Sequence, residues 1–296
     1  MTGLRPRFLL AYKNMNRWTT ARFDIDLSRP RVMGIVNVTP DSFSDGGRHA
    51  GTAAALAHCE QLLAEGADLL DIGGESTRPG SPAVALEEEL ARVLPVVQGA
   101  VTLGVPVSVD TYKPEVMQAV LDAGVDIIND IWALRQGDAL RLVASHPRCG
   151  VCLMHMHRDP QTMQVAPMQG DVVPLVSEFL RVRVSALRAL NVAAERIVLD
   201  PGIGFGKTVE QNFSLLARQQ ELLVAGYPLL AGWSRKSSLG VVTGRELPAE
   251  RVSASVAAAL LAVDRGGRVV RVHDVRETGD VLAVWAAMQA SKTLVS

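Results

Sequence analysis

Two polar, glycine-rich stretches carry the residue types most able to do chemistry. One is Gly232-Trp233-Ser234-Arg235-Lys236, and the other is Asp200-Pro201-Gly202-Ile203-Gly204-Phe205-Gly206-Lys207. Each begins where an apolar, β-like run stops, at Ala231 and at Leu199. This layout predicts a parallel β/α protein whose chemistry lies at the carboxyl ends of its strands.

Polar residues follow the other apolar runs in the same way. In chain order the candidate strand ends carry Asn37, Gly73-Gly74-Glu75-Ser76-Thr77-Arg78-Pro79, Asp110, Asn129, His155, Asp200, Ser234 to Lys236, and Arg271 to His273. A single Asp at a strand end often only caps a helix, but polar groups at every strand end are harder to explain in that way. Buried carboxylates suit a heterocycle rich in N–H donors, because each can accept two parallel N–H bonds. Lys236 can donate to such a ring, and the Arg271 and His273 pair, with Asn37 and Thr77, can hold an anion such as diphosphate.

The elements that must position these residues form a regular alternation. The candidate strands are Val32–Val36, Asp68–Ile72, Pro106–Val109, Asp126–Ile128, Val151–His155, Arg196–Leu199, Pro228–Ala231 and Arg268–Val272. The helical patterns, with a period near 3.6, are Ala53–Ala64, Leu86–Gly99, Pro114–Ala123, Val172–Leu190, Glu210–Ala217, Ala249–Ala262 and Val275–Ala290. The alternation predicts a single (β/α)8 TIM barrel. A doubly wound sheet is the alternative, but it needs a G-x-G-x-x-G turn after the first strand, where residues 37–47 form a longer polar stretch.

Composition excludes several classes of partner. The chain has 296 residues, of which 48% are hydrophobic and 21% charged, as is typical of a soluble globular protein. Its net charge of −1 gives no reason to expect nucleic acid or a membrane surface as a partner. No apolar run reaches the roughly 18 residues that span a bilayer. The three cysteines favour a reducing compartment, and we expect the cytoplasm.

The spacing of Cys149 and Cys152 is similar to that of a zinc site. The pair runs into an apolar strand, however, where positions three apart point to opposite faces and lie roughly 10 Å apart. We therefore expect both thiols to be structural and reduced.

Eight motifs in a fixed order resemble those of the dihydropteroate synthase family. They are Met33 to Gly47, Asp71 to Gly80, Val109-Asp110-Thr111, Ile128-Asn129-Asp130, Leu153-Met154-His155-Met156, Asp200 to Lys207, Ser234 to Ser237, and Arg271 to Asp274. The resemblance covers roughly residues 20 to 290. It divides the chain into an N-terminal extension, 1–18, and a barrel domain, 19–296, that begins with a short strand pair between Thr19 and Asp26.

The resemblance implies an enzyme of folate synthesis that joins 7,8-dihydropterin-6-ylmethyl diphosphate to 4-aminobenzoate, giving 7,8-dihydropteroate and diphosphate. It implies an SN1-like reaction with Mg²⁺ as cofactor, competition by sulfonamides, and a homodimer. The implied pterin contacts are Asp110, Asn129, Met154, Asp200, Gly232, Lys236 and Arg271. Diphosphate would contact Asn37, Thr77, Arg271 and His273, with magnesium at Asn37. The 4-aminobenzoate contacts would be Phe43, Pro79, Phe205, Lys236 and Ser237, and the catalytic residues Asp41, Arg78, Lys236, Arg271 and His273.

Two other functions share part of this pattern. A methyltetrahydrofolate-dependent corrinoid methyltransferase would use the same Asp and Asn pterin contacts, but it has no need of Ser234 to Ser237 or of the loop 39–43. A catalytically silent pterin-binding relative is the second alternative. Trp233 and Tyr112 depart from the family pattern, and both are expected at the mouth of the pocket, where they would reshape it.

Overall fold

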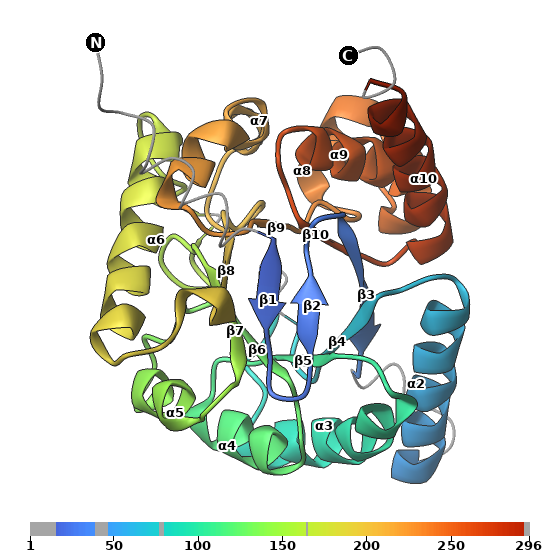
Figure 1. Ribbon diagram of the computed structural model, residues 1–296, viewed down its shortest axis with the longest axis vertical. Coiled ribbons are helices and arrows are strands. Elements are labelled where there is room, and N and C mark those ends of the chain that lie inside the picture. Colours follow the sequence, from blue (N-terminus) through green and yellow to red (C-terminus); the bar gives the residue numbers. More distant parts are fainter. Residues whose placement is uncertain (1–15, 39–46, 77–79, 164, 293–296) are drawn as a thin grey trace.

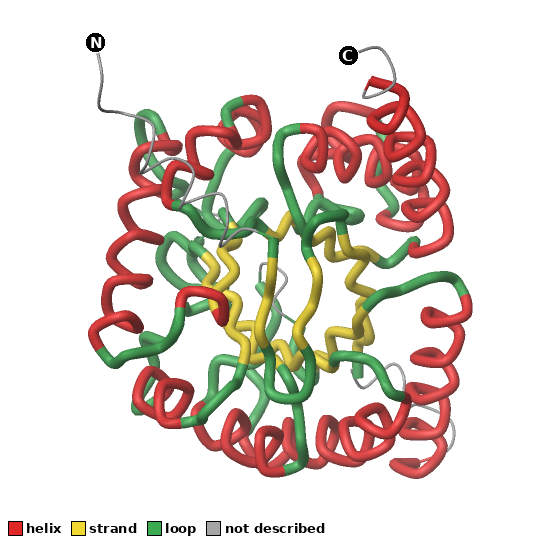
Figure 2. The backbone as a smooth tube through the Cα atoms, viewed as in Figure 1, coloured by secondary structure: helices red, strands yellow, loops and turns green. Residues whose placement is uncertain are grey.

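A computed structural model of the chain describes residues 16–38, 47–76, 80–163 and 165–292. Most of the predicted extension, 1–18, precedes the first of these ranges, so the division of the chain into extension and barrel domain stays a prediction. The described part forms a ring of strands surrounded by helices (Figures 1 and 2). This confirms the predicted (β/α)8 barrel.

The barrel consists of parallel strands in the order β8-β7-β6-β5-β4-β3-β10-β9. Their bounds are β3 Arg31–Asn37, β4 Leu69–Gly73, β5 Val107–Asp110, β6 Ile127–Asp130, β7 Gly150–Met154, β8 Ile197–Asp200, β9 Leu230–Ala231 and β10 Val269–Val272. A parallel bridge between Leu199 and Leu229 joins β8 to the segment before β9 and closes the ring. Closure aligns the carboxyl ends of all eight strands at one mouth.

The surrounding helices are α2 Gly47–Ala64, α3 Leu86–Ala100, α4 Pro114–Asp122, α5 Ala139–Ser145, α6 Val172–Ala189, α7 Val209–Ala217, α8 Ser237–Thr243, α9 Val252–Asp264 and α10 Val275–Lys292. The sequence did not predict α5 and α8, each of which is only seven residues long. The predicted helix Ala249–Ala262 is divided into a 3₁₀ turn, Pro248–Arg251, and α9. Among the described helices, none combines the length and apolarity that a bilayer span requires.

The core has two layers, and the two cysteines of the zinc-like motif belong to different ones. Cys149 lies in the layer between strands and helices, whereas Cys152 lies inside the barrel with Met33 and Ile127. Burial raises the pKa of Cys149 to about 12 and raises that of Cys152 as well. The described residues contain no cluster of metal ligands. Both thiols are buried and free, and that they are structural and reduced stays a prediction.

A short hairpin covers the end of the barrel opposite its mouth. It is formed by β1 (Arg17–Thr19) and β2 (Asp24–Asp26), which pair antiparallel, as the sequence predicted for this region. Trp18 is fully buried among residues from the starts of the barrel strands, and its indole N–H donates to the Arg196 carbonyl at 3.0 Å. The hairpin thus acts as a hydrophobic plug.

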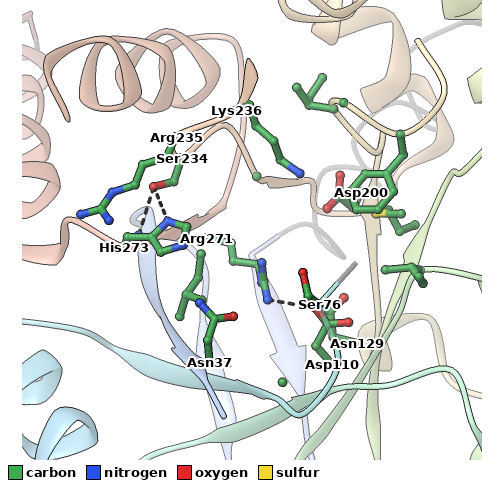
Figure 3. A pocket seen from close by; sticks show the side chains of 18 of the residues that line it. Asn37, Ser76, Asp110, Asn129, Asp200, Ser234, Arg235, Lys236, Arg271 and His273 are labelled. Atoms are coloured by element: carbon green, nitrogen blue, oxygen red, sulfur yellow. Dashed lines mark hydrogen bonds and ion pairs between the residues drawn. The ribbon is translucent and has the colours of Figure 1, made fainter. Parts of the chain in front are cut away.

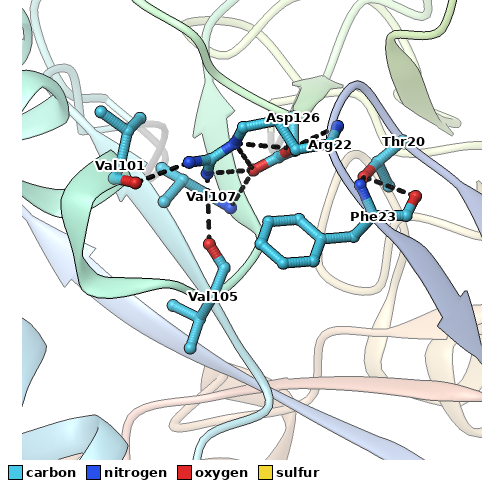
Figure 4. Close-up of polar contacts among 7 residues, drawn as sticks. All are labelled: Thr20, Arg22, Phe23, Val101, Val105, Val107 and Asp126. Carbon is cyan, nitrogen blue, oxygen red and sulfur yellow. Dashed lines mark hydrogen bonds and ion pairs between the residues drawn. The ribbon is translucent and has the colours of Figure 1, made fainter.

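Arg22, in the hairpin turn, anchors the plug to the barrel (Figure 4). Its Nη2 donates to Asp126 Oδ2 at 2.6 Å and its Nε to Oδ1 at 3.1 Å. Its guanidinium also donates to the carbonyls of Val101 and Val105, at 2.5 and 3.2 Å. Asp126 is fully buried and accepts in addition from the Val107 N–H at 2.9 Å.

We predict that Arg22→Ala lowers the free energy of unfolding by about 2 kcal/mol, because the buried Asp126 carboxylate loses its charged donor. Urea denaturation measures this loss. Arg29→Ala is the matched control, since Arg29 is mostly exposed and pairs with Asp68 at the same end of the barrel. That change should cost less than about 0.5 kcal/mol. Equal losses in the two variants would contradict an anchoring role for Arg22.

Candidate active site

A cavity of about 280 Å³ opens at the carboxyl ends of the strands. Every predicted site residue that lies in the described part of the chain lines it: Asn37, Asp110, Asn129, Met154, Asp200, Phe205, Gly232, Lys236, Ser237, Arg271 and His273. The other five, Asp41, Phe43, Thr77, Arg78 and Pro79, lie outside the described residues. Residues separated by more than 200 positions therefore face one space (Figure 3).

Arg271, on β10, is the centre of a charged cluster in the floor of this cavity. Its Nε donates to Asp71 Oδ2 at 2.5 Å and its Nη2 to Asp110 Oδ2 at 2.9 Å. Asn129 Nδ2 donates to the same Asp71 oxygen at 3.2 Å. The cluster joins β10, β4, β5 and β6, and it holds two carboxylates against one guanidinium. The two carboxylates raise the pKa of Arg271 despite its burial, so this residue stays charged.

One oxygen of each carboxylate remains for other partners. Asp71 Oδ1 and Asp110 Oδ1 are buried and have no hydrogen-bond partner in the described structure. Asp110 also lines the cavity, so an N–H donor of a ligand can reach a carboxylate that is already oriented by Arg271. Burial raises the pKa of Asp110 to about 7, while Arg271 opposes the shift and Asp71 adds to it.

Asp200, on β8, forms a second acceptor in the cavity wall. Its Oδ1 accepts from the Gly202 N–H at 2.7 Å, which leaves Oδ2 to face the cavity near Gly232. Gly202 has a φ of +68°, and a β-carbon there would lie 1.9 Å from the His155 carbonyl oxygen. Only glycine permits this approach of the loop to β7. The orientation of Asp200 thus depends on the glycine that follows it.

Another part of the cavity wall is cationic and apolar. Lys236 Nζ lies 4.4 Å from the centre of the Phe205 ring, a distance typical of a cation–π contact. Phe205 packs with Met154 and Met163, which also line the cavity. Ser237 follows Lys236 at the first turn of α8. This wall can hold a flat apolar ring beside a positive charge.

His273 and Ser234 form the third side of the cavity. The Ser234 hydroxyl lies 2.9 Å from His273 Nδ1 and accepts from the His273 backbone N–H at 3.1 Å. Arg235 is turned away toward Asp274, to which its Nη2 donates at 2.5 Å. The His273 ring is therefore fixed beside Arg271, as Figure 3 shows.

Sequence reasoning misplaced Trp233 and overlooked other residues. Trp233 does not reshape the mouth, because it is buried in the outer core against Phe213 of α7, at 5.3 Å between ring centres. Tyr112 acts indirectly: its hydroxyl donates at 3.0 Å to Glu75, which lines the cavity and also pairs with Lys113. Overlooked residues are Asp71 and the buried Lys207, whereas Glu75 belongs to the predicted strand-end set and lines the cavity. The pairing of the two overlooked residues depends on contacts between different strand ends, and no local pattern indicates it.

The fold and this cavity define the class of a barrel enzyme that binds pterins. A sequence profile described as pterin binding enzyme matches residues 33–273. The chain belongs to the dihydropteroate synthase family of these enzymes. It is 51% identical to the dihydropteroate synthase of Neisseria meningitidis serogroup B over 276 residues, covering 92% of this chain and 97% of the relative.

Two solved structures support the same assignment. Dihydropteroate synthase from Xanthomonas albilineans, determined with 4-aminobenzoic acid, has 53% identity and a TM-score of 0.87, covering 93% of this chain and 99% of its own. The Burkholderia cenocepacia dihydropteroate synthase, complexed with 7,8-dihydropteroate, has 51% identity and a TM-score of 0.86. The match covers 95% of this chain and 99% of the Burkholderia chain.

We predict that Asp200→Asn weakens the binding of a pterin by roughly 2–4 kcal/mol. The Asn side-chain oxygen must still accept the hydrogen bond from the Gly202 N–H. The new NH₂ group would therefore face the cavity, where it would meet N–H donors of the pterin instead of accepting from them. Calorimetric titration measures the effect, and the melting temperature serves as the control for folding. An unchanged dissociation constant in a folded variant would refute this role of Asp200.

The affinity for a pterin should also depend on pH through Asp110. Ligand N–H donors favour the ionised carboxylate, whose pKa is raised to about 7 in the empty site. Affinity is then greatest above pH 7 and decreases as the pH falls through that value. In Asp71→Asn one carboxylate that raises the pKa of Asp110 is lost, so the decrease should move to lower pH. Calorimetric titration of a pterin between about pH 5 and pH 9, roughly two pH units on each side of the Asp110 pKa, measures the pH dependence of affinity. An identical pH profile in the variant would contradict this prediction.

Proposed function

We propose that this chain condenses 7,8-dihydropterin-6-ylmethyl diphosphate with 4-aminobenzoate to give 7,8-dihydropteroate and diphosphate. One observation carries the proposal: Asp110, with an unpartnered oxygen, and Asp200 face the same cavity as the pair formed by Lys236 and Phe205. One side of the cavity suits a donor-rich heterocycle, and the other suits an aromatic ring near a cation. The activity named for the family members described above unites these two ligands.

The residues divide among three ligand groups. For the pterin we propose Asp110, Asn129, Met154, Asp200, Gly232, Lys236 and Arg271; for diphosphate, Asn37, Thr77, Arg271 and His273; for 4-aminobenzoate, Phe43, Pro79, Phe205, Lys236 and Ser237. Asp41 and Arg78 complete the proposed catalytic set with Lys236, Arg271 and His273. Arg271 belongs to two groups for two reasons. Its guanidinium donates to Asp110, which is assigned to the pterin, and it lies beside His273, which is assigned to the diphosphate.

The reaction requires neutralisation of the charge on the leaving diphosphate more than it requires a general base. Loss of diphosphate from a methylene on an electron-rich dihydropterin leaves a resonance-stabilised cation, which favours an SN1-like route. Arg271 and His273 would neutralise the charge that develops on the leaving group. An aniline amine is uncharged at neutral pH and can attack directly. The apolar wall of Met154, Met163 and Phe205 would keep water away from the cation.

Magnesium fits this site as a partner of the diphosphate. The described residues offer no cluster of three acidic, His or Cys ligands, but Asn37 lines the cavity with an amide oxygen. Mg²⁺ commonly takes few protein ligands and is completed by waters and substrate phosphates. Asn37 would therefore hold the ion together with diphosphate oxygens. Bound there, Mg²⁺ would supply Lewis-acid neutralisation of the leaving group.

We also propose a homodimer in the cytoplasm. Three apolar side chains are exposed on α8 and the segment that follows it: Val241 and Val242 of the helix have exposed fractions of 67% and 58%, and Leu247 after it has 61%. Covering them against a second copy would remove this apolar surface from water. Buried free thiols are consistent with a reducing compartment.

Purified protein supplied with both substrates and magnesium tests the proposed activity. Formation of 7,8-dihydropteroate and diphosphate in equal amounts is the expected result. A corrinoid methyltransferase or a silent relative would produce neither. Complementation of a strain that lacks its own dihydropteroate synthase gives an independent measurement, and failure in both experiments would refute the proposal.

We predict that 4-aminobenzoate binds only after diphosphate or the pterin diphosphate. The sequence predicts long βα loops at residues 37–50 and 74–84, where about 2–6 residues are usual. The first prediction is too long, because Asn37 ends β3 and α2 already begins at Gly47. Both connections remain longer than usual, and they adjoin or carry the proposed ligands of magnesium and diphosphate, Asn37 and Thr77. An anion held by Arg271 and His273 would recruit both segments and complete the 4-aminobenzoate site. Titration of 4-aminobenzoate with and without magnesium diphosphate measures the coupling. A sulfonamide should compete in the same titration, and equal affinity in both conditions would show that the sites are not coupled.

A further inference from the structure

Lys207 is a buried lysine that the proposed chemistry does not use. It ends the glycine-rich loop after β8, and only 3% of its surface is exposed. Its Nζ donates to three backbone carbonyls: Gly202 at 2.8 Å, Phe205 at 3.1 Å and His155 at 3.3 Å. Lys207 does not line the cavity, so any effect on a ligand must pass through the groups that it holds.

The number of acceptors matches the charged form of this side chain. An ammonium group has three N–H donors, and each of them meets one carbonyl, whereas a neutral amine has only two. Burial lowers the pKa of Lys207 to about 7, while the nearby Asp200 carboxylate favours the cation. Without the ammonium, three carbonyl dipoles would converge on one buried point with no donor between them.

The three carbonyls come from two different segments. Those of Gly202 and Phe205 belong to the loop after β8, and that of His155 follows β7. The loop approaches β7 very closely, since a β-carbon at Gly206 would lie 2.8 Å from the His157 carbonyl oxygen. The His155 ring does not help to hold the loop, because it packs edge-on against Phe179 at 4.9 Å between ring centres. Lys207 is thus a side chain that ties the loop to the end of β7, in addition to the backbone bonds from the His155 N–H to the Asp200 carbonyl and from the His157 N–H to the Phe205 carbonyl.

This loop supplies one wall of the cavity. Ile203, Gly204 and Phe205 line it, and Phe205 lies under the Lys236 ammonium. On its other side the loop is held by Asn212, whose Oδ1 accepts from the Gly204 N–H at 2.8 Å. A shift of the loop would therefore move the Phe205 ring and separate it from Lys236.

We propose that Lys207 is a positioning residue for the arylamine side of the cavity: by donating to three carbonyls it holds Phe205 where the aromatic ring of 4-aminobenzoate contacts it. This inference rests on the proposed function for the identity of the ligand. It predicts a larger effect on 4-aminobenzoate than on the pterin, because the pterin contacts Asp110 and Asn129 lie on β5 and β6, apart from the loop. Asp200 is a pterin contact that the loop also orients, through Gly202, so the effect on the pterin is smaller but not absent.

The test is Lys207→Met, which keeps the length of the side chain and removes its donors. The KM for 4-aminobenzoate should rise by about 10- to 100-fold, while the KM for the pterin diphosphate should rise by a smaller factor, about three- to fivefold, because Asp200 is oriented through the same loop. Arg196→Met is the matched control. Arg196 is also buried and donates to three backbone carbonyls, of Cys149, Val143 and Pro147, but it lies at the opposite end of β8. That variant should lose stability with both KM values unchanged.

A merely structural role would lower the melting temperature of both variants and leave the ratio of the two KM values as in the wild type, and that result would overturn the proposal. Should Lys207→Met fail to fold, Lys207→Gln keeps two N–H donors and should shift the same ratio in the same direction. Wild-type KM values in that variant would also overturn it. Failure of the proposed function is distinguishable, because the wild type would then form no dihydropteroate. Equilibrium titration of 4-aminobenzoate with magnesium diphosphate, comparing Lys207→Met with Arg196→Met, would still measure the positioning effect.

Discussion

The burial of charge in the mouth of the barrel is the constraint on which the site depends. Arg271 is partly buried between Asp71 and Asp110 and donates to both carboxylates, which offsets part of the cost of burying them. The contact joins β10 to β4 and β5, and Asn129 extends it to β6. The Arg271 guanidinium holds one oxygen of each carboxylate in place. The second oxygen of Asp110 is therefore oriented before a ligand binds. Ligand recognition and the alignment of four strands therefore share one interaction.

The two ends of the barrel use buried charge for different purposes. At the closed end Arg22 and Asp126 satisfy each other and the backbone, and Trp18 fills the space between the strands. This arrangement leaves nothing for a ligand and contributes to stability. At the open end the groups are incompletely satisfied within the chain, as the unpartnered Asp110 oxygen shows. Unsatisfied buried acceptors cost stability, and a ligand with matching donors recovers that cost as binding free energy.

The glycines after β8 allow backbone and side chains to share a crowded space. Gly202 lets the loop touch the end of β7, and the same contact aligns Asp200 for the cavity. Phe205, three residues on, faces the cavity beside Lys236. Lys207 stabilises the loop by donating to the carbonyls of Gly202 and Phe205. Acceptor wall, aromatic wall and anchor thus come from eight consecutive residues, whose geometry depends on positive φ angles that larger residues avoid.

The sequence by itself determined the alternation of strands and helices, the polar residues at the strand ends and the opposite faces of Cys149 and Cys152, because these depend on local periodicity. It did not indicate α8, a short helix that contains Gly240. It also did not show that Trp233 turns into the outer core, or that Asp71 and Lys207 hold the site. Those contacts join residues from different strands and loops. Only the closure of the barrel brings such residues together, and their distances then decide which groups pair with one another and which remain for a ligand.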